Sequence, residues 1–146
     1  MVRENGKQDG DNRKHASQKI FSGRRFLLVE DNELNREIAS QLLELAGAAV
    51  ECAMDGKDGA EAFEEKEENY YDAIFMDIQM PVMNGYEAAK HIRASAHPQA
   101  KSIPIVAMSA NAFSEDVRTA LESGMNAHVG KPIDMDTLAN VLAGLL

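Results

Sequence analysis

The chain has 146 residues, of which 15 are Lys or Arg and 24 are Asp or Glu, so its formal net charge is −9. This length supports one domain with a hydrophobic core, and 45% hydrophobic residues is an ordinary share for a globular protein. Such an acidic chain lacks the positive surface of a nucleic-acid or anionic-membrane binder, although it can attract a divalent cation or a basic partner.

The single cysteine, Cys52, excludes a disulfide framework within the chain and favours a reducing compartment. We expect Cys52 to be a small buried hydrophobic residue. No apolar run approaches the roughly 20 residues of a membrane-spanning helix, and the first residues lack the apolar core of a signal peptide. These features predict a cytoplasmic domain without membrane contact.

Taken in chain order, residues 1–23 are polar, which predicts a flexible tail or linker before a domain over residues 24–146. The predicted strands are short apolar runs over residues 26–29, 50–53, 73–76, 103–108 and 127–129. The predicted helices show helical spacing of apolar residues, or richness in Ala and Glu, over residues 34–45, 55–69, 86–94, 113–121 and 138–145. Gly47 stands at the expected end of the first helix.

Strands that alternate with helices of this length predict a parallel sheet covered on both faces. Five such units are too few for an eight-stranded barrel. We therefore predict an α/β fold with a doubly wound open sheet, in which ligands bind at the carboxyl ends of the strands.

Polar side chains follow four of the predicted strands. They are Glu30 and Asp31 after the first, Asp77 after the third, Ser109 after the fourth and Lys131 after the fifth. Because the ends of parallel strands share one edge, we expect these groups to converge. Three neighbouring carboxylates repel one another unless a cation neutralises them, and Mg²⁺ suits such oxygen ligands. A lysine binds phosphate, and an aspartate is a known phosphoryl-accepting nucleophile, so the set favours phosphoryl transfer.

Taken singly, each residue also has a structural interpretation. Asp31 or Asn32 can cap the helix that follows, Asp77 can begin a turn, and Ser109 can be a loop hydroxyl. The joint occurrence of these residues at four strand ends favours a shared site.

The segments that carry these residues resemble the response-regulator receiver family. They are VEDN at 29–32, MDIQMPVMNG at 76–85, AMSAN at 107–111 and GKPI at 130–133. They follow the family's order and spacing, and the similarity runs from about Phe26 to the C-terminus. The stretch 124–128 is most similar to receivers of hybrid sensor histidine kinases. The resemblance implies a flavodoxin-like (βα)5 sheet with the strand order 2-1-3-4-5.

The resemblance also implies roles at the strand ends. Asp77 would accept a phosphoryl group from a phosphohistidine. Glu30, Asp31, Asp77 and the backbone carbonyl of Gln79 would hold Mg²⁺. Lys131 would pair with Asp77 and then with the phosphoryl oxygens.

Further roles concern switching and lifetime. Ser109 and His128 match the family's switch hydroxyl and switch aromatic, so we expect both to move inward when Asp77 is phosphorylated. That movement would reshape the surface of the fourth helix, fifth strand and fifth helix. Gln79 and Asn111 stand where the family tunes self-dephosphorylation.

The implied partners are a histidine kinase domain or a histidine-phosphotransfer protein, which would dock near the first helix, at residues 35–46. The bond between Lys131 and Pro132 is expected to be cis. The domain would catalyse its own phosphorylation and dephosphorylation, and within a hybrid histidine kinase the full protein would be a kinase. The alternative is a pseudo-receiver that binds proteins without phosphorylation, against which the intact set of site residues argues.

Overall fold

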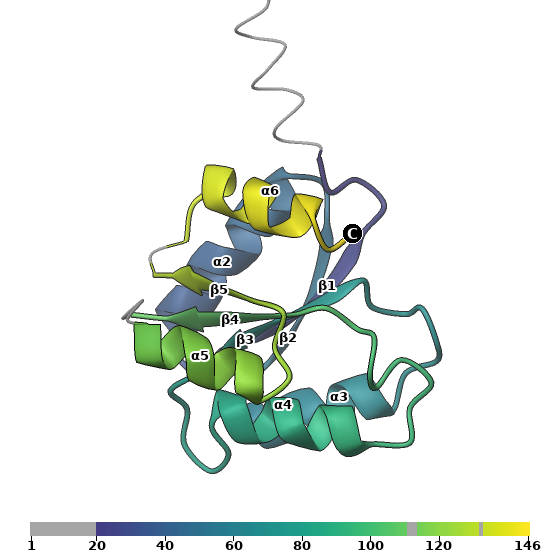
Figure 1. Cartoon of the computed structure of the whole chain (residues 1–146). Helices are drawn as coiled ribbons and strands as arrows, with labels where there is room; N and C mark the ends of the chain where they lie inside the picture. Colours follow the sequence, from purple (N-terminus) through teal and green to yellow (C-terminus); the bar gives the residue numbers. More distant parts are fainter. Residues whose placement is uncertain (1–19, 111–113, 132) are drawn as a thin grey trace, which may run out of the picture.

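A computed structural model describes residues 20–110, 114–131 and 133–146. Its five parallel strands form one sheet in the order β2-β1-β3-β4-β5 (Figure 1), which confirms the predicted fold and strand order. The strands are β1 (Arg25–Val29), β2 (Ala49–Ala53), β3 (Ala73–Asp77), β4 (Ile105–Ser109) and β5 (Ala127–Gly130). The helices are α2 (Glu33–Leu45), α3 (Gly56–Glu64), α4 (Gly85–Ala94), α5 (Ser114–Glu122) and α6 (Met135–Ala143).

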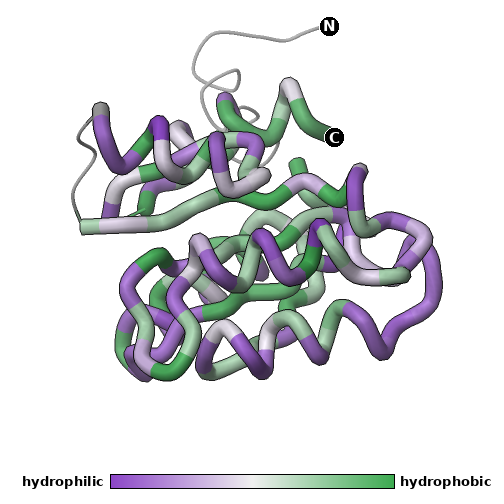
Figure 2. The backbone as a smooth tube through the Cα atoms, turned by 60° about the horizontal axis from the view of Figure 1, so that its bottom comes forward, coloured by the Kyte–Doolittle hydropathy of each residue, from purple (hydrophilic) through white to green (hydrophobic). Residues whose placement is uncertain are grey.

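Alternate residues of the central strands point to opposite faces and build two cores. Leu27 and Val29 of β1 pack with α3, α4 and α5 on one face. Phe26 and Leu28 of the same strand pack with α2 and α6 on the other. Figure 1 shows this three-layer arrangement. Figure 2 shows the apolar stretches concentrated in the strands, as expected for a sheet that is buried on both faces.

Side chains at the predicted helix starts satisfy free backbone N–H groups. The Asn32 side chain accepts from the Asn35 N–H at 2.9 Å and caps α2. Asn84 and Glu87 form a reciprocal capping box at the start of α4. Gly47, with φ +99°, follows the end of α2 and confirms its predicted C-terminal position. Among the described residues, no helix has the length and apolar character needed to cross a bilayer.

Three sequence expectations were wrong in detail. The helix expected over 55–69 ends at Glu64, because the chain must turn back towards β3 and Asn69 adopts a φ of 68°. Cys52 is exposed, because β2 is an edge strand. The fourth strand begins at Ile105, directly after Pro104, which has no N–H to donate to a sheet.

Candidate functional site

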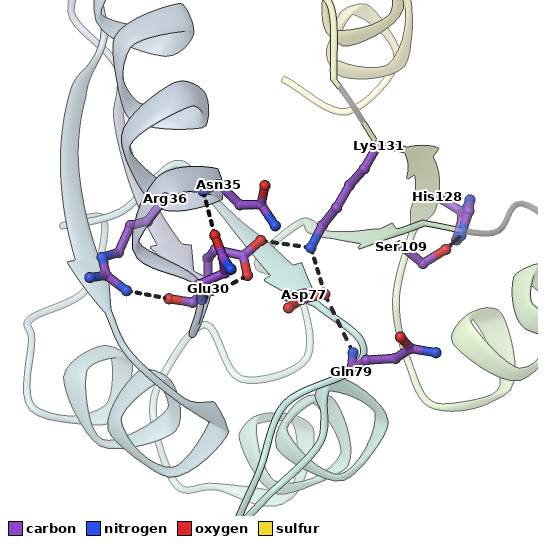
Figure 3. A network of polar contacts seen from close by, with 9 residues as sticks. Glu30, Asn35, Arg36, Asp77, Gln79, Ser109, His128 and Lys131 are labelled. Atoms are coloured by element: carbon purple, nitrogen blue, oxygen red, sulfur yellow. Dashed lines mark hydrogen bonds and ion pairs between the residues drawn. The ribbon is translucent and has the colours of Figure 1, made fainter.

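The carboxyl ends of the strands bring four polar side chains to one edge of the sheet (Figure 3). Glu30 directly follows β1, Asp77 ends β3, Ser109 ends β4 and Lys131 directly follows β5. Glu30, Asp77 and Ser109 are only 1%, 3% and 4% exposed. Burying two carboxylates is costly unless they are paired, so the cation supplied by Lys131 is part of what makes this edge stable.

Asp31 completes an acidic cluster with these two carboxylates. One oxygen each from Glu30, Asp31 and Asp77 lies within 4.8 Å of the others. Glu30 and Asp77 are buried, whereas Asp31 is exposed and opens the cluster to solvent. A hard divalent cation that keeps several waters suits such a half-open group of carboxylate oxygens, so these residues fit Mg²⁺.

Lys131 bridges both buried carboxylates. Its Nζ lies 2.7 Å from Glu30 Oε1 and 3.1 Å from Asp77 Oδ1. Burial alone would lower the pKa of Lys131, but the hydrogen bonds with Glu30 and Asp77 outweigh it and raise that pKa. Lys131 therefore stays charged, and its contact with Glu30 is additional to the pairing with Asp77 that the sequence led us to expect.

The surroundings of Asp77 raise the pKa of its carboxyl group. Burial is the largest cause that raises the pKa of Asp77, and the neighbouring Glu30 adds to it. Lys131 opposes both, and the pKa settles at about 7 instead of the ordinary 3.8. Asp77 is thus buried next to a second carboxylate, and Lys131 alone does not compensate for both effects. A bound divalent cation would add the positive charge that favours the ionised form of Asp77.

The loop after β3 holds Asp77 through its backbone. The Gln79 N–H donates to Asp77 Oδ1 at 3.4 Å, a long contact. The Gly85 N–H donates to the Ile78 carbonyl at 2.9 Å and closes the loop. A side chain at Gly85 would place its Cβ only 2.4 Å from the Asp77 carbonyl oxygen, so a glycine is required for α4 to approach the site this closely.

Ser109 ends β4, the strand next to that of Asp77, and His128 lies on β5, one strand further along the sheet. Ser109 Oγ and His128 Nε2 are 2.8 Å apart, a hydrogen-bond distance. Burial lowers the pKa of His128, and Asp116 opposes that effect. Asn111 and Pro132 lie outside the described residues, so the roles predicted for Asn111 and for the bond before Pro132 stay predictions.

Arg36 and Asn32 also hold the acidic edge, and the sequence reasoning did not assign them this role. Arg36 Nη1 donates to the backbone carbonyl of Glu30 at 2.9 Å. The Asn32 N–H donates to Glu30 Oε2 at 3.2 Å. The available signal was the position of Asn32 in the turn after β1 and of Arg36 in the first turns of α2, but such contacts depend on side-chain conformations that a pattern does not specify.

A model of the response regulator receiver domain family matches residues 26–143, and the chain belongs to this family. It is 38% identical over 126 residues to the peroxide stress-activated histidine kinase mak1 of Schizosaccharomyces pombe. It is 39% identical over 121 residues to hybrid signal transduction histidine kinase A of Dictyostelium discoideum. These matches cover 86% and 82% of this chain but only 8% and 6% of the two kinases.

Two solved structures extend the comparison. One is the receiver domain of the sensor histidine kinase PA1611 of Pseudomonas aeruginosa, with a magnesium ion coordinated in its active-site cleft. Its TM-score is 0.74 at 35% identity, covering 85% of this chain and 98% of that chain. The other is the Saccharomyces cerevisiae co-crystal of the phosphotransfer protein Ypd1 with the Ssk1 receiver domain, with a TM-score of 0.73 at 31% identity over 87% of this chain and 91% of that chain. The chain is thus a receiver domain of two-component signalling.

Proposed function

We propose that this chain is an active phosphoacceptor, in which Asp77 takes a phosphoryl group from a phosphohistidine with Mg²⁺ as cofactor. The observation that carries the proposal is the environment of Asp77, which is 3% exposed, 3.1 Å from Lys131 Nζ and within 4.8 Å of the oxygens of Glu30 and Asp31. A carboxylate in this setting combines a nucleophilic oxygen with groups that neutralise phosphoryl charge.

In the proposed step, an oxygen of Asp77 forms a bond to phosphorus while the phosphorus–nitrogen bond of the phosphohistidine breaks. The imidazole leaves as a neutral ring that keeps a proton, and Asp77 becomes an acyl phosphate. Glu30, Asp31, Asp77 and the carbonyl of Gln79 would hold Mg²⁺, which supplies positive charge next to the phosphoryl oxygens. Lys131 Nζ, already at hydrogen-bond distance from Asp77, is placed to pair with one of those oxygens.

The switch is proposed to begin at Ser109. Its hydroxyl lies 2.8 Å from His128 Nε2, and this hydrogen bond must open before Ser109 can turn to a phosphoryl group on Asp77. Release of His128 would then shift the population towards a state with a different surface over α5, β5 and α6. Gln79 and Asn111 are proposed to tune how long the acyl phosphate survives.

The proposed donor is a histidine kinase domain or a histidine-phosphotransfer protein that docks on α2. This helix exposes two apolar side chains near the site, Leu34 at 65% and Ile38 at 46%. Ile38 also lines a pocket beside Glu30 and Lys131. Exposed apolar groups next to a reactive centre suit a partner that must bring its own histidine close to Asp77.

Leu34→Asp tests this docking surface. We expect it to slow phosphotransfer from a phosphorylated histidine-phosphotransfer protein by about tenfold, because one central apolar contact contributes on the order of 1–2 kcal/mol. The rate with acetyl phosphate should stay unchanged. Leu121→Asp is the matched control, since Leu121 is 52% exposed on α5. Equal slowing by both variants would refute docking on α2.

Acetyl phosphate and Mg²⁺ test the phosphoacceptor itself. The intact protein should gain the mass of one phosphoryl group, and neither Asp77→Asn nor the wild type in EDTA should gain it. A pseudo-receiver, the competing proposal, would gain no mass under any of these conditions. His91→Asn is a suitable control and should gain the same mass as the wild type. His91 is an exposed residue of α4 that contacts Glu64 of α3 and none of the site residues.

We also propose residues 24–146 as the receiver unit and residues 1–23 as a linker, of which Phe21 is anchored because it is buried against the domain. The chain spans 6–16% of the length of the first curated relatives it matches. We propose in addition that a longer protein containing this domain is a kinase. We also propose that the domain is located in the cytoplasm. Support comes from the similarity to hybrid histidine kinases and from the lone free Cys52.

A further inference from the structure

The geometry points to Arg36 as a positioning residue that orients the acidic pair Glu30 and Asp31 for cation binding. This inference rests on the proposed function, because it assigns a task to Arg36 only if those two acids bind Mg²⁺. Arg36 belongs to α2 and not to the cluster itself, so it would act through the backbone of the acidic pair.

The contact lies on the peptide unit that joins the two acids. Arg36 Nη1 donates to the Glu30 carbonyl oxygen at 2.9 Å (Figure 3). Within the described parts of the chain, no other hydrogen bond to this carbonyl is found. On the preceding peptide, the Glu30 N–H donates to the Ala53 carbonyl at 3.1 Å. The plane of the Glu30–Asp31 peptide is therefore held by Arg36 after the chain has left the sheet.

Asp31 depends on that peptide more than Glu30 does. The Glu30 carboxylate is held by Lys131 at 2.7 Å and by the Asn32 N–H at 3.2 Å. Asp31 is exposed, and its carboxylate has no hydrogen-bond partner among the described residues. Its direction thus comes from the backbone, and the Arg36 contact restricts that backbone.

The start of α2 holds Arg36 in place. The Arg36 N–H donates to the Asn32 carbonyl at 2.9 Å, and the Asn32 side chain caps the same turn. The Arg36 side chain is only partly exposed and reaches back to the end of β1. One helical turn therefore carries the cap and the guanidinium, which ties the acidic pair to a rigid element.

Because Arg36 is positively charged, the direction in which its removal changes Mg²⁺ affinity tests the inference. A positive charge beside a cation site repels the cation, so removing it should tighten Mg²⁺ binding if Arg36 acts only through its field. If Arg36 orients the acidic pair, removing it should weaken Mg²⁺ binding instead. The two explanations predict opposite changes in one measured quantity.

The experiment compares Mg²⁺ affinities of the wild type, Arg36→Met and Arg36→Lys by following amide NMR shifts during titration with MgCl₂. We expect Arg36→Met to bind Mg²⁺ about tenfold more weakly, at the low end for residues that orient metal ligands. Arg36→Lys keeps a donor and should recover part of the affinity. Lys57→Met is the matched control, because it removes one exposed positive charge from the start of α3.

A second readout separates positioning from damage to the fold. In the absence of Mg²⁺, the amide shifts of Arg36→Met should match those of the wild type away from the acidic edge, which shows that the variant is folded. Unchanged or tighter Mg²⁺ binding by a folded Arg36→Met protein would overturn the inference. Absence of Mg²⁺ binding by the wild type would instead overturn the proposed function.

Discussion

Replacing Asp77 by asparagine should stabilise the metal-free protein at pH 8. The substitution keeps the shape of the side chain but removes a carboxylate that burial and Glu30 both disfavour. The pKa of Asp77 is raised from 3.8 to about 7. At about 1.4 kcal/mol for each pKa unit, this sets an upper limit of about 4 kcal/mol for the cost of its charge. We expect about half of that as a net gain for Asp77→Asn, because water reaches the open side of the site.

The pH dependence has a definite sign. A carboxyl group with a raised pKa in the folded state stabilises the protein below its unfolded pKa, and this stability is lost as pH rises through the folded value. For Asp77 the loss runs from about pH 4 to about pH 7. The advantage of Asp77→Asn should therefore be large at pH 8 and smaller at pH 5.

Urea denaturation followed by circular dichroism in EDTA measures both effects. Asp58→Asn, an exposed position on α3, should change the free energy of unfolding by less than about 0.5 kcal/mol at either pH. Saturating Mg²⁺ in place of EDTA should reduce the difference in the free energy of unfolding between the wild type and Asp77→Asn, because the cation neutralises the wild-type carboxylate. The reasoning would be refuted if Asp77→Asn were no more stable than the wild type at pH 8. It would also be refuted if the gain in stability were as large at pH 5 as at pH 8.

Two further substitutions test the loop and the packing around the site. Gly85→Ala would place a Cβ 2.4 Å from the Asp77 carbonyl oxygen, so we expect phosphorylation by acetyl phosphate to slow by about tenfold or more, whereas Gly144→Ala, with open space around its Cβ, should match the wild type. Arg93→Met removes three hydrogen bonds from α4, to two backbone carbonyls and to the Asn126 side chain. We expect it to lower the free energy of unfolding by about 2–3 kcal/mol in urea, and a loss below about 0.5 kcal/mol would contradict this role.

The sequence alone determined the succession of strands and helices along the chain, and it determined which polar residues follow the strands. Apolar runs and helical spacing are local properties, and parallel strands must place their carboxyl ends at one edge. The sequence therefore assigns Asp77 and Lys131, 54 positions apart in the chain, to one site. The same local chemistry explains why the caps at Asn32 and Asn84 lie where helices were expected to begin.

Only the tertiary structure decided how the side chains meet. That Lys131, directly after the edge strand β5, contacts Glu30 at the end of β1 as well as Asp77 depends on how the chain after β5 lies across the carboxyl ends of the strands. The contact of Arg36 with a backbone carbonyl depends on one side-chain conformation. Cys52 is exposed because of its place at the sheet edge, which its own strand-like neighbours do not reveal. Periodicity reports which face a residue occupies, whereas distances between side chains come from packing among elements far apart in the chain.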